Sequence, residues 1–167
     1  MTEGFLERRD DGCRPVWLVA EHEIDAWTAR CPAGEAAAAW LRANGFRAER
    51  HRVLPLPTGA NGELGGAVLG LGRLASLDEL TPWHLAGLPE RLPNGRYHLA
   101  DALSPTAATQ AALGWALGRY RFDRYRRPPT APRAALVAPA GADLAYVKRA
   151  AEADALARDL INTPAAD

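Results

Sequence analysis

The sequence predicts an α/β domain in which helices flank a mixed β-sheet. Short apolar segments of strand length alternate along the chain with segments of helical periodicity, an order typical of α/β domains. Asn61-Gly62 lies between two of the apolar segments, and Asn-Gly in that position is a strong hairpin signal. At least one pair of strands should therefore be antiparallel, whereas the strand order does not follow from the sequence.

The first 45 residues predict a strand, a short helix and a longer helix. Residues 1–14 are mostly polar, and one short strand fits within them. Pro15–Ala20 is an apolar run of strand length, and Glu21–Thr28 suits a short helix. Gly34–Asn44 is rich in alanine and leucine, which favour helix, and Asn44-Gly45 suits a left-handed C-cap.

The next apolar segments, His51–Leu56 and Gly66–Leu71, are the expected strands of the hairpin. The glycine-rich run Gly59–Gly72 invites comparison with a phosphate-binding loop, in which successive backbone N–H groups open a helix. Here the glycines precede and line a strand, and no Gly-Lys-Ser/Thr follows. We therefore interpret the run as part of the hairpin.

Two helix starts and one strand follow the hairpin. Ser76–Glu79 has the spacing of a capping box, where a helical segment begins. Thr81-Pro82 is a second N-cap with a first-turn proline, which predicts a helix over Trp83–Leu88. Asn94-Gly95 then turns the chain into the expected strand Arg96–Leu99.

The following segments predict a second apolar helix and a last strand. Ser104-Pro105 repeats the start signal before an apolar helix over Thr106–Tyr120. Arg127–Pro132 carries three prolines and is expected to be an exposed linker or edge. Ala134–Ala138 has the composition of a short buried strand.

The terminal segment, Ala142–Asp167, has the periodicity of an amphipathic helix. Asp143 is the expected N-cap, and Asp154 precedes Arg158 by four residues, the favourable order for an ion pair. Since a residue before proline avoids the α region, the helix should end near Thr163. The apolar stripe of this helix consists of Tyr146, Ala150, Ala153, Ala157, Leu160 and Ile161.

This long helix leads directly to the last residues of the sequence. We therefore expect the chain to be the front part of a larger protein, with an N-terminal α/β domain over residues 1–140. Residues 141–167 would be a connector helix and the first residues of another domain. The alanine-rich stripe would then face its own sheet, the additional domain, or both.

Composition limits the partners that we expect. The chain has 20 Lys plus Arg and 20 Asp plus Glu, so no net charge favours nucleic acid or an acidic membrane. Arg119–Arg127 mixes arginine with aromatic residues, as single-strand-binding sites do, but Asp123 interrupts it. No signal peptide and no apolar run of about 20 residues is present. We expect a cytoplasmic protein that binds neither nucleic acid nor a membrane.

No pattern in the chain predicts a catalytic or metal site. The four histidines, His22, His51, His84 and His98, do not have zinc-site spacing. His98 and Asp101 are a possible acid/base pair, although that spacing is common by chance. Cys13 and Cys31 are expected to be free thiols. The sequence therefore yields no catalytic, metal-binding or substrate-binding residue.

Two segments together resemble the leucyl (cytosol) aminopeptidase family. Arg-Asp-Leu-Ile-Asn-Thr-Pro at 158–164 resembles the segment at the start of that family's catalytic domain. Gly114–Tyr125 is similar to a helix end in the family that leads into Tyr-x-Phe-Asp-x-Tyr, and Val68–Gly72 looks like one of its strands. The three segments occur in the family's order and extend over most of the chain.

The resemblance implies a macrodomain-like N-terminal domain and a helix that enters a catalytic domain. In the family, that second domain holds two divalent metal ions, zinc or manganese, and removes N-terminal amino acids from peptides. Family members assemble as hexamers. The family's metal-binding motifs lie beyond Asp167, so no ligand or catalytic residue transfers to this chain, which we expect to need no cofactor and to be inactive alone. Its expected partners are its own catalytic domain, further copies of the protein, and the parent enzyme's peptide substrates.

Two other functions remain open at this point. Because macrodomain-like folds often hold ADP-ribose, the domain could be a nucleotide-binding module, a hypothesis that rests on fold analogy. A small free-standing hydrolase that uses His98 and Asp101 is the other alternative.

Overall fold

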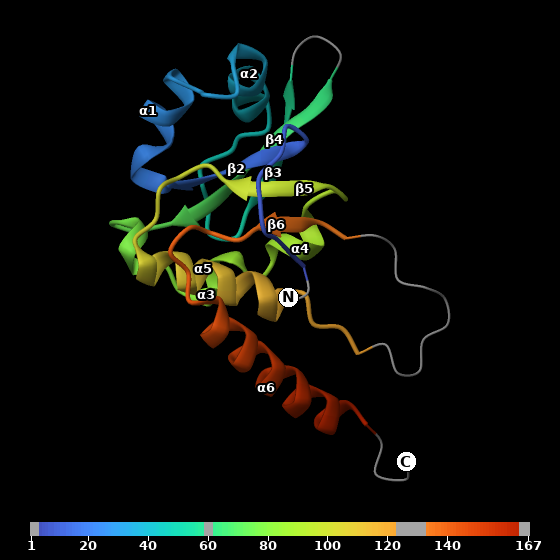
Figure 1. Ribbon diagram of the computed structural model, residues 1–167. Helices are drawn as coiled ribbons and strands as arrows, with labels where there is room; N and C mark the ends of the chain where they lie inside the picture. Colours follow the sequence, from blue (N-terminus) through green and yellow to red (C-terminus); the bar gives the residue numbers. More distant parts are fainter. Residues whose placement is uncertain (1–3, 59–61, 123–132, 164–167) are drawn as a thin grey trace.

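The computed structural model describes residues 4–58, 62–122 and 133–163 (Figure 1). Six strands form one sheet: β1 (Phe5–Leu6), β2 (Cys13–Ala20), β3 (Val53–Thr58), β4 (Glu63–Gly72), β5 (Arg96–Leu99) and β6 (Ala135–Val137). The helices are α1 (Ile24–Ala29), α2 (Glu35–Ala43), α3 (Pro82–Leu85), α4 (Leu88–Arg91), α5 (Pro105–Gly118) and α6 (Leu144–Asn162). Two 3-10 turns, η1 (Glu21–Glu23) and η2 (Leu77–Glu79), precede α1 and α3.

The strand order is β1-β6-β5-β2-β4-β3, and every neighbouring pair is parallel except β3 and β4. This arrangement confirms the predicted mixed sheet and its hairpin. The glycine-rich run enters β4, as predicted, although residues 59–61 at the turn lie outside the described residues. Pro55 and Pro57 fit in β3 because it is an edge strand, where a missing N–H leaves no neighbour unpaired.

Two of the expected boundaries are wrong, each for an identifiable reason. The strand expected from His51 begins at Val53, because His51 has a φ of 67°, outside the extended region. The helix expected over Trp83–Leu88 is two short helices, α3 and α4, and Pro89 lies in the first turn of α4. A proline suits a first turn because no intrahelical acceptor is available there for its missing N–H. Arg127–Pro132, the expected linker, lies outside the described residues.

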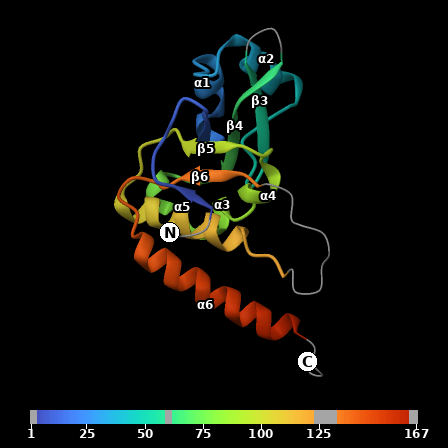
Figure 2. The same ribbon diagram turned by 45° about the vertical axis from the view of Figure 1, so that its right-hand side comes forward.

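Helices cover the two faces of the sheet unequally (Figures 1 and 2). On one face, α1 and α2 enclose a small core with residues of β2, β3 and β4, including Val19, Leu41 and Val68. On the other face, α3, α4 and α5 enclose the larger core, which contains Tyr97 and Trp115. The sequence places α5 in this layer because no charged side chain interrupts it.

Helix α5 lies unusually close to α3 at two glycines. A Cβ on Gly114 would come within 2.1 Å of the Pro82 carbonyl oxygen, and one on Gly118 within 1.9 Å of the Ala86 oxygen. Both positions therefore require glycine, since any side chain would push the two backbones apart. Ser104 caps the start of α5 as predicted, because its hydroxyl accepts the Ala107 N–H at 3.3 Å.

Helix α6 runs along the outer side of α5, away from the sheet (Figures 1 and 2). Its capping and length agree with the prediction: Asp143 accepts the Tyr146 N–H at 2.9 Å, and the helix ends at Asn162. The predicted Asp154–Arg158 ion pair forms at 2.8 Å. Among the described residues of α6, Val147 alone is buried.

The apolar stripe of α6 is not the face that α5 covers. The covered positions centre on Val147, Ala151 and Arg158, roughly 100° around the helix from the stripe. Within the stripe, Ala150 packs against the core, whereas the rest is exposed. Alanine periodicity alone could not separate the two faces, because α5 covers a face that also includes charged residues paired within α6.

Candidate functional site

The alternative acid/base pair, His98 and Asp101, is not brought together. His98 lies on β5 and its Nδ1 contacts the carbonyl oxygen of Leu99 at 3.1 Å. The Asp101 carboxylate instead accepts the backbone N–H of Leu18 at 2.8 Å. Burial, followed by the charge of Glu23, raises the pKa of Asp101, while the bond from Leu18 opposes the rise. Asp101 thus has a structural role in extending the contact between β5 and β2.

The described residues contain no group of three or more His, Cys, Asp or Glu that could hold a metal ion. Cys13 is buried and Cys31 is half-buried, and both are free, as predicted. Burial raises the pKa of the Cys31 thiol, which disfavours the reactive thiolate. His51 and His84, far apart in sequence, do approach each other, with ring centroids 6.3 Å apart.

The side chains that the structure does bring together lie where the end of α5 meets α6. The Tyr120 hydroxyl donates to Asp159 Oδ1 at 2.8 Å and accepts from Asn162 Nδ2 at 3.2 Å. The Arg158 guanidinium lies over the Tyr120 ring, 5.1 Å from its centroid, and pairs with Asp154. We call these five residues the α5–α6 joint.

The chemistry of the joint favours a fixed contact. Partial desolvation and the Asp159 carboxylate raise the pKa of Tyr120, while the bond from Asn162 opposes the rise, and the protonated hydroxyl donates to Asp159. The joint unites the two segments that carry the family resemblance, since Tyr120 belongs to one and Asp159 and Asn162 to the other. The sequence shows both segments, but their contact depends on the folding of the chain between them. Asp123 and Tyr125 of the first segment lie outside the described residues.

Helix α6 also presents large apolar side chains to solvent, three of them beside the joint and one, Tyr146, in its first turn. Leu156, Leu160 and Ile161 are 62%, 71% and 82% exposed, and Tyr146 is 44% exposed. We call these four residues the α6 ridge. Exposed apolar side chains that gather on one element mark interaction surfaces more often than scattered ones do. The joint therefore holds in place a helix whose outer surface is uncovered.

Fold and joint together define an α/β domain that is built on a six-stranded mixed sheet and continued by a long C-terminal helix. Residues 14–139 match the N-terminal domain of M17 aminopeptidases, and the chain belongs to that family. The resemblance to leucyl aminopeptidases is thereby confirmed, as is the predicted fold class. No curated protein sequence matches the chain.

Solved structures agree with this assignment. The cytosol aminopeptidase of Coxiella burnetii is 26% identical with a TM-score of 0.81, and the match covers 99% of this chain and 34% of that one. The bottromycin maturation enzyme BotP, in complex with Mn, is 27% identical with a TM-score of 0.62 (93% of this chain, 33% of that one). A mutant of tomato leucine aminopeptidase, 19% identical with a TM-score of 0.54, shares the fold (97% of this chain, 38% of that one).

The chain thus spans about a third of the length of the first solved structures it matches. Over the described ranges, no helix is both long enough and apolar enough to cross a bilayer.

Proposed function

We propose that the chain is the non-catalytic N-terminal domain of a leucyl-aminopeptidase-type metallopeptidase. The α6 ridge carries the proposal, because it is an uncovered apolar surface beside a joint built from family motif residues. In this proposal, residues 1–140 are the domain itself, and residues 141–167 connect it to a catalytic domain that covers the ridge. The greater length of the solved relatives supports such a second domain.

Burial of the ridge would stabilise the domain contact. Complete burial of a leucine or isoleucine side chain contributes about 1.5–3 kcal/mol. Leu160 and Ile161, both mostly exposed, therefore hold enough apolar surface to fix α6 against a partner. The domain's roles would be to pack on the catalytic domain, to contribute contacts between subunits and to narrow access to the active site.

The parent enzyme would act in the cytoplasm as a homo-oligomer, a hexamer by family resemblance, and remove N-terminal amino acids from peptides. The two divalent ions, zinc or manganese, would be held by the catalytic domain, since a two-metal site needs several convergent ligands. The Mn complex of BotP supports manganese as a candidate. Within the described residues this chain has no such ligand group.

An activity assay tests the non-catalytic assignment. We expect the 167-residue chain to release no nitroaniline from aminoacyl-nitroanilides, with or without added manganese or zinc. Metal-dependent turnover by the purified chain would contradict the proposal.

A chimera tests the docking of α6. In the chimera, this chain would replace the matching third of the Coxiella burnetii enzyme, and the peptidase activity and subunit assembly of the chimera would be measured. We expect Leu160→Asp with Ile161→Asp to reduce both relative to the unsubstituted chimera. The matched control is Trp83→Asp, an exposed apolar residue on α3 that should leave both unchanged. Equal behaviour of the ridge variant and the control would count against docking through α6.

A macrodomain-like ADP-ribose module stays a prediction of the sequence. Calorimetry with ADP-ribose tests it, and absence of heat at high micromolar ligand would remove it.

A further inference from the structure

Four basic side chains from separate segments gather near the carboxyl end of β4. Arg50 and His51 come from the loop between α2 and β3, His84 from α3 and Arg91 from α4. The rings of His51 and His84 lie 6.3 Å apart, and the Arg91 guanidinium donates to the His51 carbonyl oxygen. We call these four residues the basic cluster.

The backbone of the loop is fixed against β4. The His51 N–H donates to the Gly70 carbonyl at 3.0 Å, and the Gly72 N–H donates to the Ala48 carbonyl at 2.8 Å. A Cβ on Gly70 would lie 2.3 Å from the Glu49 carbonyl oxygen, so glycine permits this close approach. Ala48 and His51 both have positive φ, 58° and 67°. Strain of this kind persists where the surroundings impose it, and it is frequent at ligand sites.

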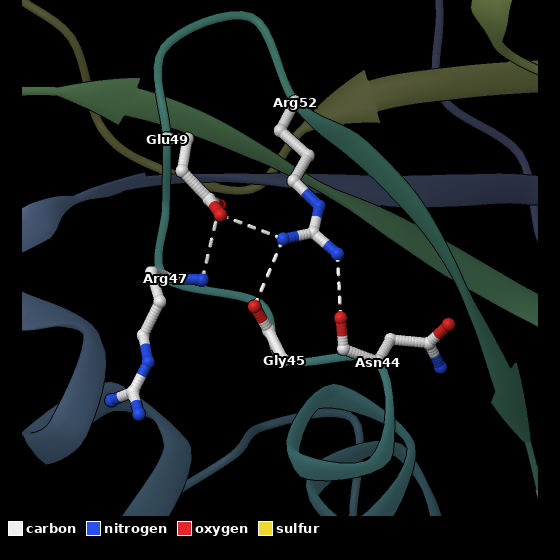
Figure 3. Close-up of polar contacts among 5 residues, drawn as sticks. All are labelled: Asn44, Gly45, Arg47, Glu49 and Arg52. Carbon is white, nitrogen blue, oxygen red and sulfur yellow. Dashed lines mark hydrogen bonds and ion pairs between the residues drawn. The ribbon is translucent and has the colours of Figure 1, made fainter.

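The nearest acidic side chain of the loop is already engaged. Glu49 accepts from the Arg52 guanidinium at 2.7 Å and from the Arg47 N–H at 3.1 Å (Figure 3). Arg52 also donates to the carbonyl oxygens of Asn44 and Gly45 at the end of α2. On α4, Glu90 lines a separate hollow with Asn94 and Arg121. Neither carboxylate is thus placed to neutralise the basic cluster.

The orientation of His84 and Arg91 is also set. His84 Nδ1 accepts the Thr81 N–H at 3.1 Å, so the neutral ring carries its proton on Nε2. The Arg91 guanidinium extends across Gly87, with its Cζ 3.5 Å from the position of a Cβ there.

Among the described residues, the pKa shifts of the two histidines agree with an excess of positive charge here. Burial lowers the pKa of His51, and the charges of Arg50 and Arg91 lower it further. Burial also lowers the pKa of His84, with smaller contributions from Arg50 and His51. No carboxylate contributes to either shift. An anion at this position would meet two permanent charges and two rings that can each take up a proton.

We propose that the basic cluster binds a phosphate-type dianion, either free or carried by a small molecule. Paired arginine guanidinium groups suit phosphate oxygens. The position also agrees with the rule that open α/β sheets bind ligands beyond the carboxyl ends of their strands. This inference is independent of the role proposed for α6.

Histidine NMR on the 167-residue chain tests the proposal, with inorganic phosphate as the probe at constant ionic strength. We expect phosphate to shift the resonances of His51 and His84 and to raise both of their pKa values. His22 and His98 are internal controls and should not respond. Sulfate, which keeps two negative charges as the pH falls, should bind more tightly at lower pH because the two rings take up protons. AMP separates the sources: tighter binding than phosphate indicates a nucleotide, and equal binding indicates the phosphate group alone.

Substitution provides the second measurement. Arg50→Gln should weaken phosphate binding at least about tenfold, as expected for loss of a charge-assisted contact. The matched control is Arg73→Gln, whose side chain is 94% exposed and pairs with Glu21 instead. The proposal is overturned if phosphate leaves His51 and His84 unchanged, if all four histidines respond alike, or if the two arginine variants bind equally.

Discussion

Helices α5 and α6 are both alanine-rich, with five alanines in 14 residues and six in 19, yet they occupy opposite environments. Seven residues of α5 are buried, whereas in α6 the structure buries Val147. The difference lies in what surrounds the alanines. In α5 the other residues are uncharged and include two glycines and Trp115, while in α6 charged residues separate the alanines. A high alanine content therefore accompanies close packing in α5 and an exposed surface in α6.

The comparison separates two ways of holding a helix. Helix α5 is held by backbone contact at Gly114 and Gly118 and by the burial of Trp115. Helix α6 is held at its start by Val147 and at its end by the polar contacts of Tyr120. Substitutions in α5 should therefore affect the whole fold, and substitutions in α6 should act locally.

Trp115→Ala should have the largest effect. Trp115 is fully buried, and its Nε1–H donates to the Gly4 carbonyl at 3.2 Å. We expect a loss of about 3–5 kcal/mol in the free energy of unfolding, measured by urea denaturation. Trp83→Ala, at a position that is 59% exposed, is the control and should cost far less. Similar losses for the two variants would contradict the burial assigned to α5.

Gly114→Ala should have the next largest effect. The added methyl group would meet the Pro82 carbonyl at 2.1 Å, and backbone cannot yield as a side chain can. We expect a loss of about 1–3 kcal/mol in unfolding free energy, the cost of overpacking. Ala153→Leu adds more volume on the exposed face of α6 and should cost almost nothing. If both variants unfold at the same denaturant concentration, the close contact of α5 with α3 is wrong.

Tyr120→Phe should have a smaller, local effect. The ring stays beneath Arg158, while the hydroxyl contacts to Asp159 and Asn162 are lost. We expect a loss of about 1 kcal/mol, seen as faster hydrogen exchange in the last turns of α6 but not around Val147. Tyr146→Phe removes a hydroxyl elsewhere on α6 and is the control. Uniform acceleration along α6, or none, would argue against the joint.

Lowering the pH should change stability least, and this change should come from two histidines that lie outside α5 and α6. The pKa values of His51 and His84 lie below 6.5 in the folded chain, so the unfolded chain binds more protons near that pH. Their contribution to stability is complete above pH 6.5 and is lost as the pH falls toward the folded pKa values. Urea midpoints of the wild type should decline over this range more steeply than those of His51→Gln with His84→Gln. Parallel curves would exclude the two histidines.

Most of the fold was predictable because its signals are local. The hairpin, the start of α5 at Ser104 and the limits of α6 each depend on residues close together in sequence. Boundaries failed where a backbone conformation was imposed from elsewhere. His51 takes a positive φ because the loop is bonded to β4.

The functional features were less predictable, because they depend on contacts between distant residues. His98 and Asp101 are close in sequence, but each has a backbone partner of its own. The basic cluster unites three segments that no spacing rule connects. In the sequence, the α5–α6 joint is visible only as two separate motifs. The exposure of the apolar stripe depends on which face of α6 packs against α5, and the sequence does not determine that face.

The double attachment of α6 has a mechanical consequence. The Asp143 N–H is bonded to Thr109 on α5 at 3.0 Å, and near the other end of the helix Asp159 accepts from Tyr120. A helix pinned near both ends resists rotation about its own axis as well as swinging from one hinge. Torque applied at Leu160 would pass through α5 to the backbone contact with α3. A partner that binds α6 would therefore also fix the orientation of the sheet relative to itself.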